Sequence, residues 1–404
     1  MPSPPAADPP EFKQVSWDEV DPSGSPLTAE RVVLLVGLAT VAALLAYDLT
    51  AEPPTLVAGW DVSQIEWAVL VSVAVLLAYG LVPALRRRAR VRRVLGRLRS
   101  RPAAVAAGLF LVGFALIALV GPVVLSRPRL QFQHAFHPPV GFSTGVDVYQ
   151  CLGETTGSVF EQRCHGTMEF PLGTNRRGHS VGHLLVNGAR TALNVLLVTA
   201  ALVVPVAVLT GLVAGTRGGL VDDLLMAYVD VQLSVPAVMV YFIGFVYLGP
   251  SLLLLVVAFG LFSWGGIARL VRSEVLQRRE SGYVTVAESL GASRSYIARR
   301  HVLPNVTSTV VPAVFQLLAL LVLVEAGVAF LGFHDIQVYS WGATISEGLN
   351  AVVAGQVQNR ASVPAYRIWW VSTFPALALA ATMLSLKLLG DALRDALDPR
   401  GGEE

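Results

Sequence analysis

The sequence predicts an all-α protein that crosses a membrane several times. Three observations support this fold class: long uninterrupted apolar stretches, a low content of charged residues, and arginines gathered in particular loops. Hydrophobic residues make up 54% of the 404 residues and charged residues 14%, whereas a soluble domain carries about 25% charged residues. The mean hydropathy is +0.60. A chain of this composition exposes much of its surface to lipid rather than to water.

Eight stretches are long and apolar enough to cross a bilayer. A helix needs about 20 mainly apolar residues to span roughly 30 Å of hydrocarbon. Strands of a membrane barrel would alternate apolar and polar residues, and these stretches are continuously apolar, which favours helices. The predicted spans are 32–49, 65–85, 103–125, 192–215, 224–248, 252–271, 306–333 and 369–389.

The distribution of arginine predicts the orientation, because cytoplasmic loops carry an excess of Lys and Arg. Nine arginines lie between the second and third predicted spans, and six more lie in segment 272–304. Both segments are therefore predicted to be cytoplasmic, and with eight spans both termini are too. The loop between the first two spans contains Glu52 and Asp61 but no Lys or Arg, which fits the outside. Segment 126–186 is predicted to be an extracellular loop despite its five arginines, since long loops follow the rule weakly.

The predicted extracellular loop contains the two cysteines of the chain, Cys151 and Cys164. Because thiols outside the cell tend to oxidise, we expect a disulfide between them, worth about 3 kcal/mol to the loop. The alternative is two free thiols. His134, His137 and His165 lie nearby, but their spacing matches no standard zinc pattern. No metal site is predicted, and these histidines are expected on the surface.

Several functional classes are disfavoured by what the sequence contains. Residues 1–30 are polar, acidic and rich in proline; they are predicted to form a disordered cytoplasmic tail and do not resemble a cleavable signal. The net charge of +2 gives no reason to expect nucleic acid as a partner. A P-loop needs a lysine in a Gly-Lys-Ser/Thr context, and the two lysines, Lys13 and Lys387, follow Phe12 and Leu386. We therefore predict no ATP site, no cofactor, no catalytic residue and no enzymatic activity in this chain.

The segment between the sixth and seventh spans has the pattern of two short helices. Residues recur at helical spacing at Val284, Ala287, Glu288 and Gly291. Gly291 would end the first helix, and Ser293 can cap a second helix that runs through Ile297. Pro304 suits the first turn of the next span. The pattern predicts a helix–turn–helix knob in the cytoplasm, with an ordinary loop lying on lipid headgroups as the alternative.

This segment resembles the cytoplasmic loop of binding-protein-dependent ABC importer permeases, whose signature is Glu-Ala-Ala, then Gly, then Ile and Leu-Pro. Gly291, Ile297 and Leu303-Pro304 stand in that register. The triplet reads Thr285-Val286-Ala287 here, so the family's glutamate is absent and Glu288 would partly replace it. The resemblance assigns contact with an ATPase subunit to a loop that contains Tyr283, Thr285, Ala287, Glu288, Gly291, Ala292, Ile297, Leu303 and Pro304.

The resemblance extends over roughly residues 100–400 and is greatest to the C-type permeases of dipeptide, oligopeptide and nickel importers. Segment 172–180 resembles the family's Leu-Gly-Thr-Asp-x-x-Gly-Arg-Asp, with His179 and Ser180 replacing Arg-Asp. Further similar segments are 214–222, 330–333, 340–342 and 389–400. The resemblance implies a six-helix type I permease domain over 102–404, with its ATPase-coupling loop at 272–304. Residues 31–101 would then add two extra transmembrane helices and an Arg-rich cytoplasmic linker.

The resemblance also implies the partners of the chain. A second permease would complete the pathway as a heterodimer, and two ATPase subunits would bind ATP and Mg²⁺ on the cytoplasmic side. A substrate-binding protein would deliver peptides or similar small solutes from outside, and the complex would sit in a prokaryotic plasma membrane. Specificity in this family rests largely with the binding protein.

Four residues inside the predicted spans have features that bear on the pathway. Intramembrane carboxylates are costly, so Asp230 and Glu325, predicted to be buried, are candidates to line it. The alternative is a contact between helices or a water-filled crevice. Pro236 and Pro375 are expected to kink their helices. Asp222 and Asp223, at the cytoplasmic edge, are expected to be solvated.

Two other functional classes compete with the importer permease. A secondary transporter driven by an ion gradient would favour inverted repeats, and no internal repeat is recognisable in the sequence. A membrane-anchored sensor or scaffold would need a sizeable soluble domain, and the longest stretch outside the predicted spans is 126–186. The importer permease explains the coupling loop, which the other two classes leave without a role.

Overall fold

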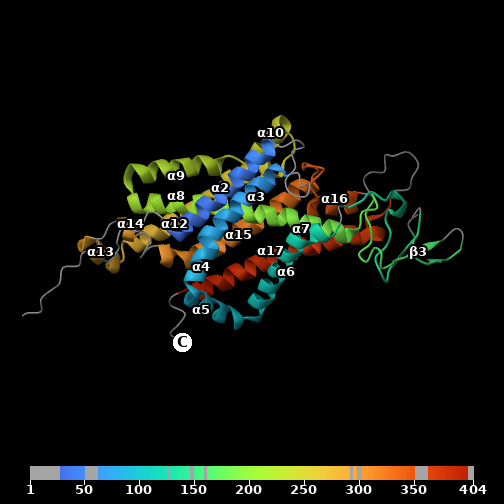
Figure 1. Cartoon of the computed structure of the whole chain (residues 1–404), viewed down its shortest axis with the longest axis horizontal. Helices are drawn as coiled ribbons and strands as arrows, with labels where there is room; N and C mark the ends of the chain where they lie inside the picture. Colours follow the sequence, from blue (N-terminus) through green and yellow to red (C-terminus); the bar gives the residue numbers. More distant parts are fainter. Residues whose placement is uncertain are drawn as a thin grey trace, which may run out of the picture.

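The structure is a computed structural model that describes residues 28–50, 62–125, 128–145, 150–158, 162–291, 294–297, 303–350 and 363–398. Most of the predicted tail 1–30 lies outside these residues. Long helices form the body of the molecule (Figure 1). A small sheet lies at one end, and two short helices, α13 and α14, project at the other (Figure 1).

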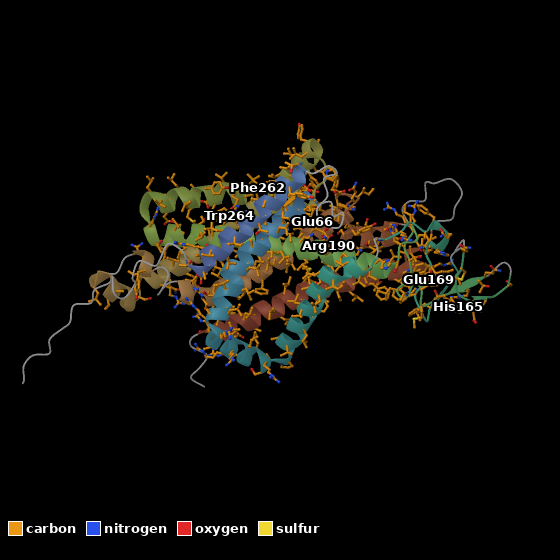
Figure 2. All side chains as sticks on the ribbon, in the orientation of Figure 1. Glu66, His165, Glu169, Arg190, Phe262 and Trp264 are labelled. Carbon is orange, nitrogen blue, oxygen red and sulfur yellow. A yellow bond between two sulfur atoms is a disulfide. The ribbon has the colours of Figure 1, made fainter. Side chains whose placement is uncertain are left out.

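The N-terminal part contains a helical hairpin followed by a basic helix. The elements are α2 (Ala29–Thr50), α3 (Gln64–Leu76), the π-helical turn η2 (Leu77–Leu81), α4 (Val82–Arg86) and α5 (Arg88–Arg99). A salt bridge of 3.0 Å between Arg86 and Glu30 joins the two ends of the hairpin. The hairpin packs on the rest of the molecule through α3, where Glu66 accepts a 2.5 Å hydrogen bond from Arg190 of α7 (Figure 2).

The remaining spans follow the predicted order. They are α6 (Pro102–Val124), α7 (Val181–Val198) with η4 (Thr199–Val203) and α8 (Val204–Arg217), α9 (Gly219–Ser234) with α10 (Ala237–Leu248), α11 (Leu252–Ser263) with α12 (Gly265–Arg279), α15 (Leu303–Phe330) and α17 (Trp369–Leu397). Shorter elements are α13 (Gly282–Ser289), α14 (Arg294–Ile297), α16 (Trp341–Asn350) and η6 (Ala365–Ile368).

The predicted span 224–248 is broken. Its helices α9 and α10 meet at 70° around Pro236, which lacks the N–H that would continue α9. Gly218, before α9, lies beside Arg279 at the end of the 28-residue span Leu252–Arg279. Ser251, after α10, immediately precedes the opposite end of that span. Among the described residues, seven helices are long and apolar enough to cross a membrane, and counting the bent pair as one further span gives the eight that the sequence predicts.

Close approach of small residues holds the central helices together. Gly211 and Gly215 on α8 face α12, where an added Cβ on Gly211 would lie 2.3 Å from the carbonyl oxygen of Ala268 and one on Gly215 2.7 Å from Val275. Small residues four apart let two helix backbones come together inside lipid. The largest hydrophobic cluster draws on α7, α11, α12, α15 and α17.

The loop after α6 folds into a small domain at one end of the molecule, called the outer domain after the side predicted for it. It contains η3 (Phe132–His134) and three short strands, β1 (Ser143–Thr144), β2 (Thr155–Thr156) and β3 (Arg163–His165). The sheet is antiparallel with the order β1-β3-β2. A disulfide with an S–S distance of 1.99 Å joins Cys151 and Cys164.

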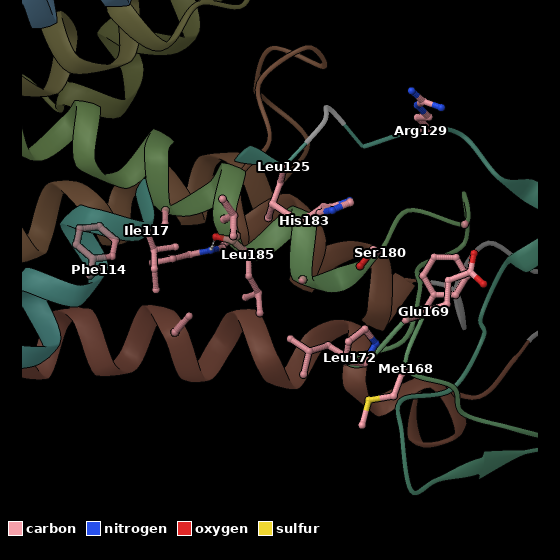
Figure 3. Close-up of a pocket in the computed structure, with 18 of the residues that line it drawn as sticks. Phe114, Ile117, Leu125, Arg129, Met168, Glu169, Leu172, Ser180, His183 and Leu185 are labelled. Atoms are coloured by element: carbon pink, nitrogen blue, oxygen red, sulfur yellow. Dashed lines mark hydrogen bonds between the residues drawn. The ribbon is translucent and has the colours of Figure 1, made fainter. Parts of the chain in front are cut away.

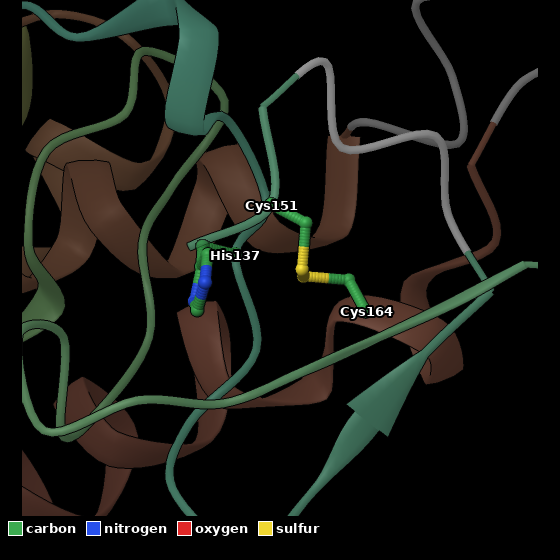
Figure 4. A group of neighbouring side chains, drawn as sticks. All are labelled: His137, Cys151 and Cys164. Carbon is green, nitrogen blue, oxygen red and sulfur yellow. A yellow bond between two sulfur atoms is a disulfide. The ribbon is translucent and has the colours of Figure 1, made fainter. Parts of the chain in front are cut away.

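The histidines of this domain correct one expectation. His134 and His137 are buried rather than on the surface, and the ring of His137 lies 5.6 Å from that of Phe170. Figure 4 shows His137 beside the disulfide. Its ring nitrogen and the two sulfurs lie within 4.8 Å of one another, but both thiols are consumed in the S–S bond. The group therefore offers a metal ion only one free ligand, the imidazole.

Candidate functional site

The projecting helices α13 and α14 form the candidate coupling knob. Ala287 and Ile297 are its inward residues, only 7% and 5% exposed, and both belong to the main hydrophobic cluster. Helix α13 ends at Ser289, and Gly291 then adopts a φ of +83°, a conformation in which a side chain would be strained. The predicted break at Gly291 is thus present, and a second helix follows it as predicted, α14 (Arg294–Ile297).

Several predicted loop residues can be placed only by their backbone. Tyr283, Thr285 and Glu288 belong to α13, and Leu303 and Pro304 form the first turn of α15. The side chains of these five lie outside the described part of the structure. Ala292 lies outside the described residues altogether.

Two further residues of the knob, which the sequence pattern does not single out, are exposed and apolar. Val286 and Leu290 are each 58% exposed, four residues apart on or directly after α13, and they point away from the side that buries Ala287. A helix that offers apolar residues at this spacing can dock into a hydrophobic groove. The sequence does contain a signal for them. Val286 and Leu290 are two large apolar residues at helical spacing, on a different side of the helix from the set that contains Ala287.

The two intramembrane carboxylates have different surroundings. Asp230 was predicted to be buried, but its side chain is 60% exposed and pairs with Arg269 of α12. Glu325 on α15 is buried, with 5% exposed. It lines a small cavity with Tyr241, His334 and Ser340, and Asp230 does not line this cavity. The structure therefore does not bring the two carboxylates into one site.

Asp222 is the clearest departure from the expected solvated residues. It is buried and accepts two hydrogen bonds from Arg272, with Nε–Oδ1 at 2.5 Å and Nη2–Oδ2 at 2.6 Å. This fork geometry is the strongest arrangement of an arginine and a carboxylate. The pair fixes α9 to α12, the helix that leads to the knob. Asp223, its neighbour, is exposed as expected.

Segment 172–180 anchors the outer domain to the helices. The Asn175 side chain accepts from the backbone N–H groups of Arg177 and His179 and donates to Glu347 of α16 at 2.8 Å. Burial raises the pKa of the Glu347 carboxyl, and the charge of Arg177 opposes that shift. The indole of Trp370 donates to the carbonyl oxygen of Thr174 at 3.0 Å. These contacts hold the outer domain over α16 and α17.

A cavity of about 1050 Å³ lies between α6, α7 and the outer domain. Figure 3 shows Phe114, Ile117 and Leu185 among the helices, and Arg129 and Glu169 toward the outer loops. The wall inside the helices is apolar and the outer side carries charge. The cavity could not be predicted from the sequence, because its lining comes from separate segments that only the fold brings together.

Comparison with known proteins assigns the family. Residues 207–401 match the family described as "Binding-protein-dependent transport system inner membrane component". The chain is 31% identical over 244 residues to the dipeptide transport system permease protein DppC of Bacillus subtilis (strain 168), covering 60% of this chain and 72% of that protein.

Two oligopeptide transport system permease proteins named OppC are also similar. The one from Bacillus subtilis (strain 168) is 29% identical over 230 residues, covering 57% of this chain and 71% of that protein. The one from Escherichia coli (strain K12) is 33% identical over 184 residues, covering 45% of this chain and 57% of that protein. With its helical spans and projecting knob, the chain therefore belongs to the binding-protein-dependent permeases and is a membrane-embedded permease subunit of an ABC importer.

Proposed function

We propose that this chain pairs with a second, different permease to form the pathway for peptides or similar small solutes. An extracellular binding protein delivers the cargo, and two separate ATPase subunits supply ATP and Mg²⁺ and perform the hydrolysis. This chain itself has no catalytic role and holds no cofactor. The proposal for the cargo is supported by the similarity to dipeptide and oligopeptide permeases.

The observation that carries the coupling role is the two-sided knob. Ala287 and Ile297 fasten it to the helical body, while Val286 and Leu290 present an apolar surface outward. An ATPase subunit that binds this surface would move the whole knob, because the knob is packed on the helical body. Because α13 follows directly on α12, such a motion passes into a span, as a rigid-body shift of packed elements.

The proposed orientation places the knob and both termini in the cytoplasm. The salt bridge between Arg101 and Asp395 and the contact of Gly218 with Arg279 group these residues at common ends of their helices. These ends are rich in arginine, as cytoplasmic ends are. The outer domain with its disulfide then faces the outside, where disulfides persist.

Pathway residues are proposed from burial and charge. Glu325 combines a buried carboxylate with a small polar cavity, an arrangement able to attract a peptide amine or a cation. Asp230 is exposed on α9 and paired with Arg269, so it would contribute to the pathway through an ion pair rather than as a lone carboxylate.

Co-purification tests the proposed assembly. The tagged chain is solubilised gently from its own host, and the proteins bound to it are identified by mass spectrometry. We expect an ATPase, a second permease and an extracellular binding protein. Recovery of the chain alone or as a homo-oligomer, under conditions that keep a known ABC importer intact, would overturn the proposal in favour of an ion-driven secondary transporter.

Substitution of the knob surface tests the coupling role. We expect the double variant Val286→Asp and Leu290→Asp to lose at least tenfold in bound ATPase while retaining the second permease. The matched control is Leu331→Asp and Ile336→Asp, which places the same charges on exposed apolar residues between α15 and α16. Equal loss of ATPase from both variants would contradict a specific role for the knob.

A further inference from the structure

Helix α5 separates an apolar side from a strongly basic one. Three of its apolar residues, Val91, Val94 and Leu98, are half-buried, whereas Leu95 is exposed. The helix packs against α6 and α17. Its six arginines are exposed. All nine basic residues of segment 86–101 are arginine, whose planar guanidinium binds phosphate in a two-pronged fashion that lysine cannot match.

The arginines of this segment fall into two groups. Some are used within the protein: Arg97 donates to the carbonyl oxygen of Ala396 at 2.8 Å, and Arg101 pairs with Asp395. Other exposed arginines form no salt bridge with any carboxylate in the described part of the chain. Of these, Arg87 precedes α5 and Arg88 donates to the carbonyl oxygen of Leu85; the second group consists of the four that remain on α5, Arg90, Arg92, Arg93 and Arg99. The first group docks α5 on the end of α17, and the second has no assigned partner.

We propose that α5 is a binding site for anionic phospholipid headgroups, held by Arg90, Arg92, Arg93 and Arg99. The reach of the chain favours lipid over a protein partner. One span ends at Arg86 and the next begins at Pro102, so α5 is tied at both ends within a few residues of the bilayer. In Figure 1, α5 lies between α4 and α6, beside the end of α17. The knob, by contrast, projects away from the spans.

Lipid binding by α5 requires neither the cargo nor the ATPase. A basic helix lying at a membrane surface binds through its apolar face and through attraction to anionic lipids. Each arginine near such a surface contributes about fivefold in affinity. Removing two of the four should therefore weaken binding to an anionic lipid by at least tenfold and leave a zwitterionic lipid unaffected.

The test titrates lipid into the full-length chain in neutral detergent and counts bound lipid by native mass spectrometry. Phosphatidylglycerol and phosphatidylcholine are compared for the wild type, for Arg92→Gln with Arg93→Gln, and for the control Arg97→Gln with Arg101→Gln. The two variants lose equal charge. We expect the wild type to prefer phosphatidylglycerol. The affinity for phosphatidylglycerol should fall at least tenfold in Arg92→Gln with Arg93→Gln and less than threefold in the control.

Several results would overturn the proposal. These are equal binding of both lipids, equal losses in both variants, or competition by inorganic phosphate at millimolar concentration. A preference that exists only after removal of residues 1–27 would show that the acidic tail occupies α5 instead. Loss of the co-purified ATPase in Arg92→Gln with Arg93→Gln would make α5 a protein-docking surface. An unchanged thermal transition and elution volume for each variant establish that it is folded.

Discussion

The ion pair between Asp222 and Arg272 joins two helices at a buried position. Replacing Asp222 with Asn removes the charge that the guanidinium faces and leaves Arg272, whose side chain is 34% exposed, without its partner. Because this cation keeps some contact with its surroundings, we expect the free energy of unfolding to fall by about 1–3 kcal/mol, measured by thermal or denaturant unfolding in detergent. Asp223→Asn is the control, because that neighbouring carboxylate is exposed and should change stability by less than about 0.5 kcal/mol. Similar losses in the two variants would mean that the pair contributes nothing specific.

His137 gives the outer domain a predictable response to pH. Burial lowers the pKa of its imidazole from the ordinary value of 6.5, with His134 acting in the same direction and Glu169 opposing. Below pH 6.5 the imidazole of His137 is therefore protonated more readily in the unfolded loop than in the folded one. The free energy of unfolding of the domain falls as the pH drops below 6.5. We expect the domain to be cleaved faster by protease at pH 5.5 than at pH 7.5, and His137→Gln to reduce that difference.

The carboxyl group of Glu347 changes the pH dependence of stability in the opposite direction to His137, so it needs a separate control. Its raised pKa means that the folded state holds the proton more tightly, so its contribution to stability grows as the pH falls toward 4.5. Glu347→Gln should therefore enlarge the acid sensitivity caused by His137. If both variants shift the profile in the same direction, the assignment to His137 is wrong.

At this scale, local chemistry could be predicted from the sequence and distant partners could not. The break at Gly291 follows from the backbone freedom of glycine, and Cys151 and Cys164 are the only cysteines in the chain. Asp222 looked solvated because its partner, Arg272, lies 50 residues away. Nothing near His137 in the sequence indicated that Phe170 and the disulfide would bury it.

Among the elements, the contact of α8 with α12 depends on glycine. An added methyl group on Gly211 would meet the backbone oxygen of Ala268 at 2.3 Å, and backbone cannot move aside as a flexible side chain can. We expect Gly211→Ala to lower the free energy of unfolding by about 1–3 kcal/mol, measured as for Asp222→Asn. Gly108→Ala is the matched control, because nothing lies within 4 Å of that position. Destabilisation by the control as large as that by Gly211→Ala would contradict the packing argument.

Hydropathy located the elements well but misjudged two of them. The span predicted from 192 begins at Val181, because its first turns contact the outer domain and can contain His183, Asn187 and Arg190. The break in span 224–248 was expected only as a kink at Pro236, since hydropathy carries no information about the angle between two helices. The exposed face of α13 was missed for a related reason: periodicity finds a helix but does not say which side is covered.

For the whole molecule, the candidate spans could be predicted from the sequence, but the place of the N-terminal hairpin could not. Lipid is as apolar as the surface of a neighbouring helix, so a hydropathy pattern does not distinguish a side that packs on protein from one that faces lipid. Helix α2 has no buried residue, whereas α3 places Ile65 in the main cluster. Among the residues that the structure describes, the directional contact between the hairpin and α7 is the ion pair of Glu66 with Arg190.

This contact allows a prediction for the chain that lacks residues 1–86. Loss of the apolar contacts should cost little, because lipid replaces them, while Arg190 loses its partner. We expect the shortened chain to insert, to retain its second permease and to lose about 1 kcal/mol of stability, as measured by unfolding in detergent. Glu66→Gln in the full chain should reproduce that loss, and Arg190→Gln should add nothing further in the shortened chain. If Arg190→Gln lowers stability equally with and without the hairpin, Arg190 acts through other contacts and the hairpin is held by packing alone.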